Sequence, residues 1–266
     1  MRDFLVRQLR RAIRLAALSA AAGYGLWEHR KLRRDASRAE CAEWLHESCE
    51  RGLSAINVQL STIGPGPTQG LLVSNHLSYL DILLLSGAMP CVFVSKAEVE
   101  HWPIFGRYAR WAGSVFVRRH DRADTARANV SVAESLQNGV PIVLFPEGTT
   151  TDGKSVLPFH STMLQPAIDA GSQITPCCVS YELDDGVVER EICWWGDMPL
   201  LPHALNLLGK KTIRATVAFG EPVIATGERK QLAQAMRLEV LRLREQFGSD
   251  RKNRPTNSAV PPQHSS

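Results

Sequence analysis

Short apolar runs alternate with longer segments of mixed polarity from residue 71 onwards. The short runs are rich in β-branched side chains, as buried strands are, whereas the longer segments have the length and boundary residues of helices. This alternation predicts an α/β fold with a mixed, mostly parallel central sheet flanked by helices. The expected strands cover residues 71–74, 91–95, 114–117, 140–146, 174–183, 187–195 and 213–220, and the expected helices cover residues 79–88, 103–111, 123–137, 201–208 and 230–247.

The N-terminal end of the chain follows a different pattern. Residues 15–27 form a stretch without charge between two groups of arginine and lysine side chains. The stretch is shorter than the roughly 20 apolar residues of a membrane span, so we expect a helix that lies on or dips into an anionic membrane leaflet. A single membrane span and an Ala-rich helix packed on the body of the protein are the alternatives.

These patterns divide the 266 residues into three parts. Residues 1–60 are expected to form a basic, amphipathic helical region associated with a membrane. Residues 61–247 are long enough for one α/β domain with a sizeable core. Residues 248–266 are rich in proline and polar residues, which is typical of a disordered tail.

The distribution of charge narrows the choice of partners. Residues 1–38 carry a net charge of +7 and the rest of the chain −3, so the total of +4 reflects a basic arm on a mildly acidic body. Such a body lacks the broad basic surface that nucleic acids require, and no nucleic-acid partner is expected. The six cysteines include no Cys-x-x-Cys pair and are too sparse for a disulfide scaffold, which indicates a reducing compartment.

The clearest candidate chemistry directly follows the strand at 71–74, in the run SNHLSYLD. His76 and Asp81 would lie about 140° apart on a regular helix, so they can meet only where His76 precedes the first helical turn. A cap at Ser74 or Asn75 would supply that geometry. The carboxylate would then orient the imidazole and leave its other nitrogen to take a proton from a hydroxyl. A helix start with a solvent-facing histidine and an unrelated aspartate explains the same spacing.

A second polar run, FPEGTT, follows the strand at 140–146 and is predicted to lie at the same edge of the sheet. It places the carboxylate of Glu147, the flexible Gly148 and the hydroxyl groups of Thr149 and Thr150 there. A simple connecting loop needs neither the glutamate nor the run of threonines. The two runs together therefore favour a functional site over two unrelated loops.

The two runs resemble known sequence blocks. Asn75-His76-x4-Asp81 and the run FPEGT resemble the first and third blocks of the glycerolipid acyltransferases of the 1-acylglycerol-3-phosphate acyltransferase type. Residues 113–119, which end in Arg119, resemble the second block, and residues 174–176 stand in the place of the fourth. Lys96 with its neighbours also matches the family pattern after the second strand. The resemblance covers roughly residues 71–223.

The resemblance implies an activity and a role for each residue. His76, oriented by Asp81, would deprotonate the free hydroxyl of a lysolipid, namely 1-acylglycerol-3-phosphate or a related lysophospholipid. This hydroxyl would attack the thioester of an acyl-CoA or an acyl carrier protein at the cytoplasmic face of the cell membrane. Backbone N–H groups around Gly148 and Thr149 would stabilise the oxyanion. Neither a metal nor another cofactor is required, although zinc bound by the histidine, the aspartate and a glutamate is an alternative. The other expected substrate-binding residues are Glu147 for the acceptor, Arg119 for a phosphate, Lys96 and Thr150.

Thr150 departs from the pattern of the family. Many phosphatidate-forming members carry an arginine there, and a threonine hydroxyl cannot replace a two-pronged guanidinium contact with phosphate. The run at 147–153 is more similar to members that acylate lysophospholipids with larger headgroups or bacterial lyso-ornithine lipids. A thioester or lipid hydrolase that uses the same pair on water, and a lipid-binding module without activity, are the remaining alternatives.

Overall fold

The computed structural model of the protein describes residues 1–32, 35–101, 105–117, 122–137 and 139–253. Its helices are α1 (Arg2–His29), α2 (Arg38–Ala55), α3 (Leu80–Ala88), α4 (Phe105–Trp111), α5 (Arg122–Leu136), α6 (Gln165–Asp169), α7 (Val188–Glu191), α8 (Leu200–Leu208) and α9 (Arg229–Asn253), with short 3-10 turns η1 (Ala97–His101) and η2 (Ser161–Leu164). Its strands are β1 (Val58–Ile63), β2 (Leu71–Ser74), β3 (Val92–Lys96), β4 (Val115–Val117), β5 (Ile142–Leu144), β6 (Gln173–Leu183), β7 (Ile213–Phe219) and β8 (Val223–Ile224).

Within the described residues, the strands form one sheet in the order β1-β7-β6-β2-β5-β3-β4, with β8 paired to β6. The pairs of β2 with β5 and β6, of β3 with β4 and β5, and of β1 with β7 are parallel. Only β6 runs antiparallel to β7 and β8 among these pairs. The predicted mixed, mostly parallel sheet is therefore confirmed, and the carboxyl ends of β2, β5, β3 and β4 meet at one edge.

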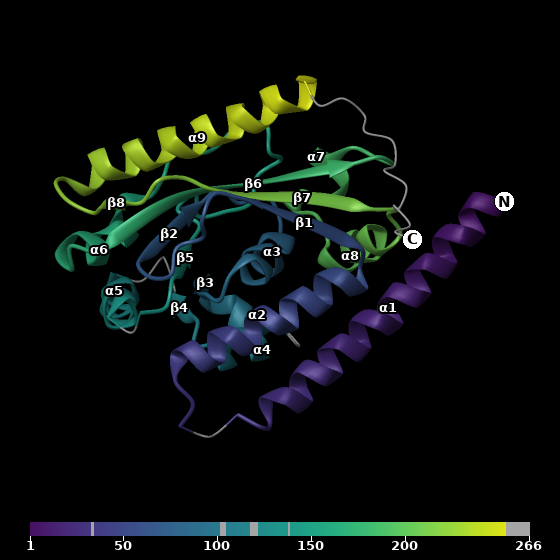
Figure 1. The fold of residues 1–266 in the computed structure, drawn as a ribbon, viewed down its shortest axis with the longest axis horizontal. Coiled ribbons are helices and arrows are strands. Elements are labelled where there is room, and N and C mark those ends of the chain that lie inside the picture. The colour runs from purple at the N-terminus through teal and green to yellow at the C-terminus, as the bar shows by residue number, and fades with distance from the viewer. Residues whose placement is uncertain (33–34, 102–104, 118–121, 138, 254–266) are drawn as a thin grey trace, which may run out of the picture.

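Helices cover both faces of the sheet. Figure 1 shows α9 on one face and α2, α3 and α8 on the other. Side chains alternate between the faces along each strand, so Leu72 packs in the core beneath α2 and α3, whereas Leu71 and Val73 pack in the core beneath α5 and α9. Every residue of β2 is buried, as expected for a parallel strand covered on both sides.

The first two helices are packed on this body. Trp44 and Leu53 of α2 belong to the same core as β2 and α3. The side chain of Arg14 on α1 is 7% exposed, and its guanidinium donates to the carbonyl oxygens of Leu208 at 3.3 Å, Lys211 at 2.7 Å and Lys210. A cation is favourable at the C-terminal end of α8 because the last carbonyl groups of a helix lack partners. Among the described residues, no helix has the length and apolar character that a membrane span needs.

Two local expectations differ from the structure. The predicted strand at 187–195 is wrong: Val188 begins the helical turn α7, and it packs on the same core as Ile192 four residues later. That spacing is helical, although apolar residues in a short run look similar in a strand. β1 begins inside the region 1–60 that was expected to be helical, and only Val58 of its residues is buried, so the strand carries no apolar run that would have predicted it.

Candidate active site

The loop after β2 rests on a part of β6 that β2 does not cover. β2 ends at Ser74, opposite Cys177, but β6 continues to Leu183. The side chain of Asn75 extends the pairing, since its Nδ2 donates to Val179 O at 3.0 Å and its Oδ1 accepts from Val179 N at 2.8 Å. The buried side-chain amide of Asn75 thus pairs with Val179 as a strand residue would. It fixes the position at which the chain leaves β2.

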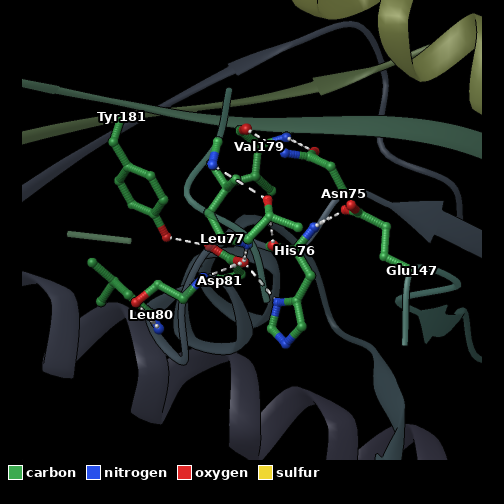
Figure 2. Close-up of polar contacts among 11 residues, drawn as sticks. Asn75, His76, Leu77, Leu80, Asp81, Glu147, Val179 and Tyr181 are labelled. Carbon is green, nitrogen blue, oxygen red and sulfur yellow. Dashed lines mark hydrogen bonds and ion pairs between the residues drawn. The ribbon is translucent and has the colours of Figure 1, made fainter. Parts of the chain in front are cut away.

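The predicted contact between His76 and Asp81 is present. His76 Nδ1 lies 2.8 Å from Asp81 Oδ2, and this oxygen also accepts from Leu77 N at 2.6 Å and Ser78 N at 3.0 Å (Figure 2). The cap expected at Ser74 or Asn75 is wrong, because α3 begins only at Leu80. The Asp81 side chain, in the first turn of α3, instead accepts the free N–H groups of the loop before the helix.

The environment of the imidazole fixes which nitrogen is available. Because the Asp81 carboxylate is an acceptor, Nδ1 carries the proton and Nε2 holds the lone pair. Nε2 points away from Asp81 (Figure 2). The ring stacks on Phe145, with 3.9 Å between centroids, and it keeps 17% of its side chain exposed, whereas Asp81 is fully buried. This is the arrangement of a general base with its orienting carboxylate.

The carboxylate of Glu147 binds the backbone next to the imidazole of His76. Its Oε1 accepts from His76 N and its Oε2 from Leu157 N, both at 2.7 Å. The residue is 3% exposed, and burial raises the pKa of its carboxyl to about 7, against the lowering effect of the two hydrogen bonds. The sequence suggested a contact with the acceptor, but both oxygens already bind backbone N–H groups of the protein.

In the turn after Glu147, one of the two expected oxyanion donors already has an acceptor within the protein. Gly148, with φ of 77°, donates its N–H to Phe145 O at 3.1 Å, so this N–H is not available to a substrate. Thr149 is exposed, and its N–H has no acceptor among the described residues. Thr151 N donates to His76 O at 2.9 Å, which ties this turn to the histidine. Thr150 is half-buried next to it.

Of the other expected contacts, Lys96 lies farther along the sheet edge. Lys96 is exposed at the carboxyl end of β3, and β5 separates this strand from β2. Arg119 lies outside the described residues. The structure thus brings together His76, Asp81 and Glu147. In the described part of the chain, no group of histidine, cysteine and acidic side chains has the arrangement of a metal site.

Tyr181 is the residue of the site that sequence reasoning missed. Its phenolic O–H donates to Asp81 Oδ1 from β6, and it shares the buried face of this strand with Cys177 and Val179. A phenol at a buried position needs a polar partner. That requirement was visible in the alternation of β6, but the identity of the partner depends on the fold.

Comparisons with known proteins identify a family of acyltransferases. The family model described as Acyltransferase matches residues 56–180. The lyso-ornithine lipid O-acyltransferase of Pseudomonas aeruginosa is 37% identical over 201 residues, which cover 73% of this chain and 76% of that protein. A 1-acyl-sn-glycerol-3-phosphate acyltransferase of Neisseria meningitidis serogroup B is 37% identical over 137 residues, which cover 50% of this chain and 54% of that protein.

The fold agrees as well. The crystal structure of the 1-acyl-sn-glycerophosphate acyltransferase from Thermotoga maritima superimposes with a TM-score of 0.68 at 22% identity, over 96% of this chain and 98% of that chain. Its sequence is too distant to indicate more than a common fold. Sequence relatives, family model and motif geometry lead to one conclusion: the chain belongs to the glycerolipid acyltransferase family.

Proposed function

We propose that this protein transfers a fatty acyl group from an acyl thioester to the free hydroxyl of a lysolipid, and that lyso-ornithine lipid is its preferred acceptor. The donor would be an acyl-CoA or an acyl carrier protein. The observation that carries the proposal is the bond of His76 Nδ1 to the buried Asp81, which leaves Nε2 free to accept a proton.

The reaction needs one proton to leave the acceptor hydroxyl and to be delivered to the departing thiolate. His76 Nε2 takes the hydroxyl proton while the oxygen attacks the thioester carbonyl, and Asp81 stabilises the imidazolium that forms. The N–H of Thr149, which has no acceptor in the described part of the chain, is the candidate donor to the developing oxyanion. Collapse of the tetrahedral intermediate breaks the C–S bond, and the imidazolium returns the proton to the thiolate. No acyl-enzyme is required.

Two observations favour the ornithine acceptor. The relative from Pseudomonas aeruginosa and those from Brucella abortus and Rhizobium meliloti, at 37–38% identity, bear the name lyso-ornithine lipid O-acyltransferase. Thr150 stands where phosphatidate-forming members have an arginine, and an ornithine headgroup carries no phosphate for such an arginine to bind. Lysophosphatidate is the second candidate, because the Neisseria relative is named for that reaction.

A membrane surface is the proposed location of the reaction, on its cytoplasmic face. Large apolar side chains remain exposed on α1, which is packed on the body through Arg14, and on α8: Phe4, Leu5, Leu9, Ile13, Tyr24, Trp27, Leu201 and Leu205. Arginines flank this surface on α1. An apolar face bordered by cations is typical of a helix that lies in an anionic membrane surface.

Purified protein with radiolabelled acyl-CoA or acyl carrier protein tests the function on lyso-ornithine lipid, lysophosphatidate and lysophosphatidylethanolamine. The proposal predicts label in the diacylated product of lyso-ornithine lipid. Free fatty acid without any acylated acceptor would identify a hydrolase instead, and a clear preference for lysophosphatidate would overturn the choice of acceptor.

Thr150→Arg tests the headgroup argument in the same assay. The guanidinium restores a two-pronged phosphate contact, so we expect activity on lysophosphatidate to rise about tenfold relative to lyso-ornithine lipid. Thr162→Arg, at an exposed position of η2, controls for added charge. An unchanged ratio of the two activities in Thr150→Arg would contradict the argument.

A further inference from the structure

The two oxygens of Asp81 have different partners. Oδ2 binds His76 and two backbone N–H groups, while Oδ1 accepts the phenolic hydrogen of Tyr181 (Figure 2). Tyr181 lies on the part of β6 that extends beyond β2, and it is 2% exposed. The phenol reaches Asp81 from the side of the carboxylate opposite to the imidazole.

We infer that Tyr181 is a positioning residue that sets the proton affinity of the His76–Asp81 pair through its hydrogen bond to Asp81 Oδ1. The inference rests on the proposed function of His76 as the base. It adds a fourth donor, from a different element, to the carboxylate that orients this base.

The hydrogen bond has a defined direction. A carboxylate only accepts, so the phenol must donate. Burial and the neighbouring Asp81 hold the pKa of Tyr181 well above its ordinary value, and the phenol therefore stays protonated throughout the working pH range. It is a permanent neutral donor to Asp81.

This donor weakens the attraction of the Asp81 carboxylate for the imidazolium. The phenol stabilises the carboxylate charge most when the imidazole is neutral, because an imidazolium already neutralises that charge. Tyr181 thus favours the unprotonated pair, which is the form that accepts the hydroxyl proton. The bond also fixes the rotation of the carboxylate, so that Oδ2 stays directed at Nδ1.

The other titratable groups that interact with Asp81 or Tyr181 lie in β6, in the segments after β5 and α7, and in the loop before α3. Burial raises the pKa of Cys177 and Tyr79 well above their ordinary values and that of Cys193 to about 12. Those three groups stay neutral. Glu147, with its pKa raised to about 7, is the neighbour that titrates in the working range, so a test must separate its effect.

The test is the pH dependence of acyl transfer by the full-length protein with Tyr181→Phe, which keeps the ring and removes the hydroxyl. The acidic limb of kcat should move to higher pH by about one unit, and kcat at neutral pH should fall about tenfold with KM within about twofold. 3-Fluorotyrosine in place of Tyr181 is a stronger donor and should move the limb to lower pH. Thermal unfolding verifies that both variants are folded.

Two controls test whether the shift of the acidic limb is specific to Tyr181. Tyr108→Phe removes a comparable phenolic bond, to Ala22 O at 2.8 Å, and should leave the limb in place. The shift caused by Tyr181→Phe should persist in the Glu147→Gln background, since it does not arise from Glu147. Limbs that stay in place for both Tyr181 variants would overturn the inference, whereas a wild-type protein without acyl transfer would overturn the proposed function.

Discussion

At the scale of single residues, the site consists of one imidazole held by two buried carboxylates in different ways. Asp81 binds the ring, and Glu147 binds the backbone N–H of the same residue. The two acids therefore fix the rotation of the side chain and the position of the chain that carries it. In the proposed function, the base therefore has a free nitrogen with one direction.

Glu147→Gln tests how the buried carboxylate of Glu147 changes the stability of the protein with pH. The folded-state pKa of Glu147 lies above its unfolded value, so the stability that this group contributes is present below about pH 4.5 and is lost as pH rises through about 7. The neutral amide avoids that loss. Between pH 4.5 and pH 8, urea unfolding should show the stability of the variant relative to wild type rising by about 1–3 kcal/mol, on top of a pH-independent loss from the unpaired backbone N–H.

Activity of the same variant should fall about tenfold. The side-chain NH₂ of glutamine cannot accept a hydrogen bond, so the backbone N–H of either His76 or Leu157 loses its acceptor. Glu221→Gln, at an exposed position, should change neither property. A stability difference between Glu147→Gln and wild type that stays the same from pH 4.5 to pH 8 would contradict the assigned role of burial.

At the scale of elements, the length of β6 positions the site. Its overhang beyond β2 gives Asn75 and Asp81 a rigid surface to bind, through Val179 and Tyr181. The loop with His76 is thus fixed by a strand as well as by the loop after β5. Trp194 N adds a further bond, to Leu77 O at 2.8 Å.

Asn75→Ala should destabilise the protein by about 2–4 kcal/mol, because it leaves the buried N–H and C=O of Val179 without partners. The loss should appear in urea unfolding together with a fall in activity of at least about tenfold, since His76 is the next residue. Gln59→Ala on the edge strand β1 is exposed and provides the control. A change of less than about 0.5 kcal/mol in the free energy of unfolding for Asn75→Ala would show that the pairing of Asn75 with Val179 is unimportant.

At the scale of the whole molecule, α1 and α9 cover different sides of the protein (Figure 1). Trp44 and Tyr108 bind the carbonyl oxygens of Gly25 and Ala22, both at 2.8 Å, and thereby hold the C-terminal half of α1. The apolar face of α1 remains directed outwards. In the proposed function this face binds the membrane, and α9 does not.

Replacing Leu9 and Ile13 on that face by aspartate should weaken binding to vesicles of anionic phospholipid at least about tenfold, since two apolar side chains no longer enter the lipid. Co-sedimentation measures the effect. Leu238→Asp on α9 removes an apolar side chain of similar exposure and should bind like wild type. Equal binding of the Leu9 and Ile13 variant would exclude this face as the membrane contact.

The sequence predicts the parts of the molecule that depend on local patterns. The apolar run of β2 and the polar run after it are sufficient to anticipate the carboxyl edge and the contact of His76 with Asp81. β1 has one buried residue and depends on β7 for its pairing. Tyr181 meets Asp81 across 100 residues of sequence, and no local pattern encodes such a contact. The contacts of Glu147 with the backbone of His76 and Leu157 likewise depend on the fold.

The most direct test of the central claim compares wild type and His76→Ala in transfer of a radiolabelled acyl group to lyso-ornithine lipid. His160→Ala, at an exposed histidine outside the site, is the matched control. The account predicts a loss of at least about a hundredfold in kcat for His76→Ala, in keeping with removal of a general base, and no change for His160→Ala. Transfer by a folded His76→Ala protein at the wild-type rate would contradict it.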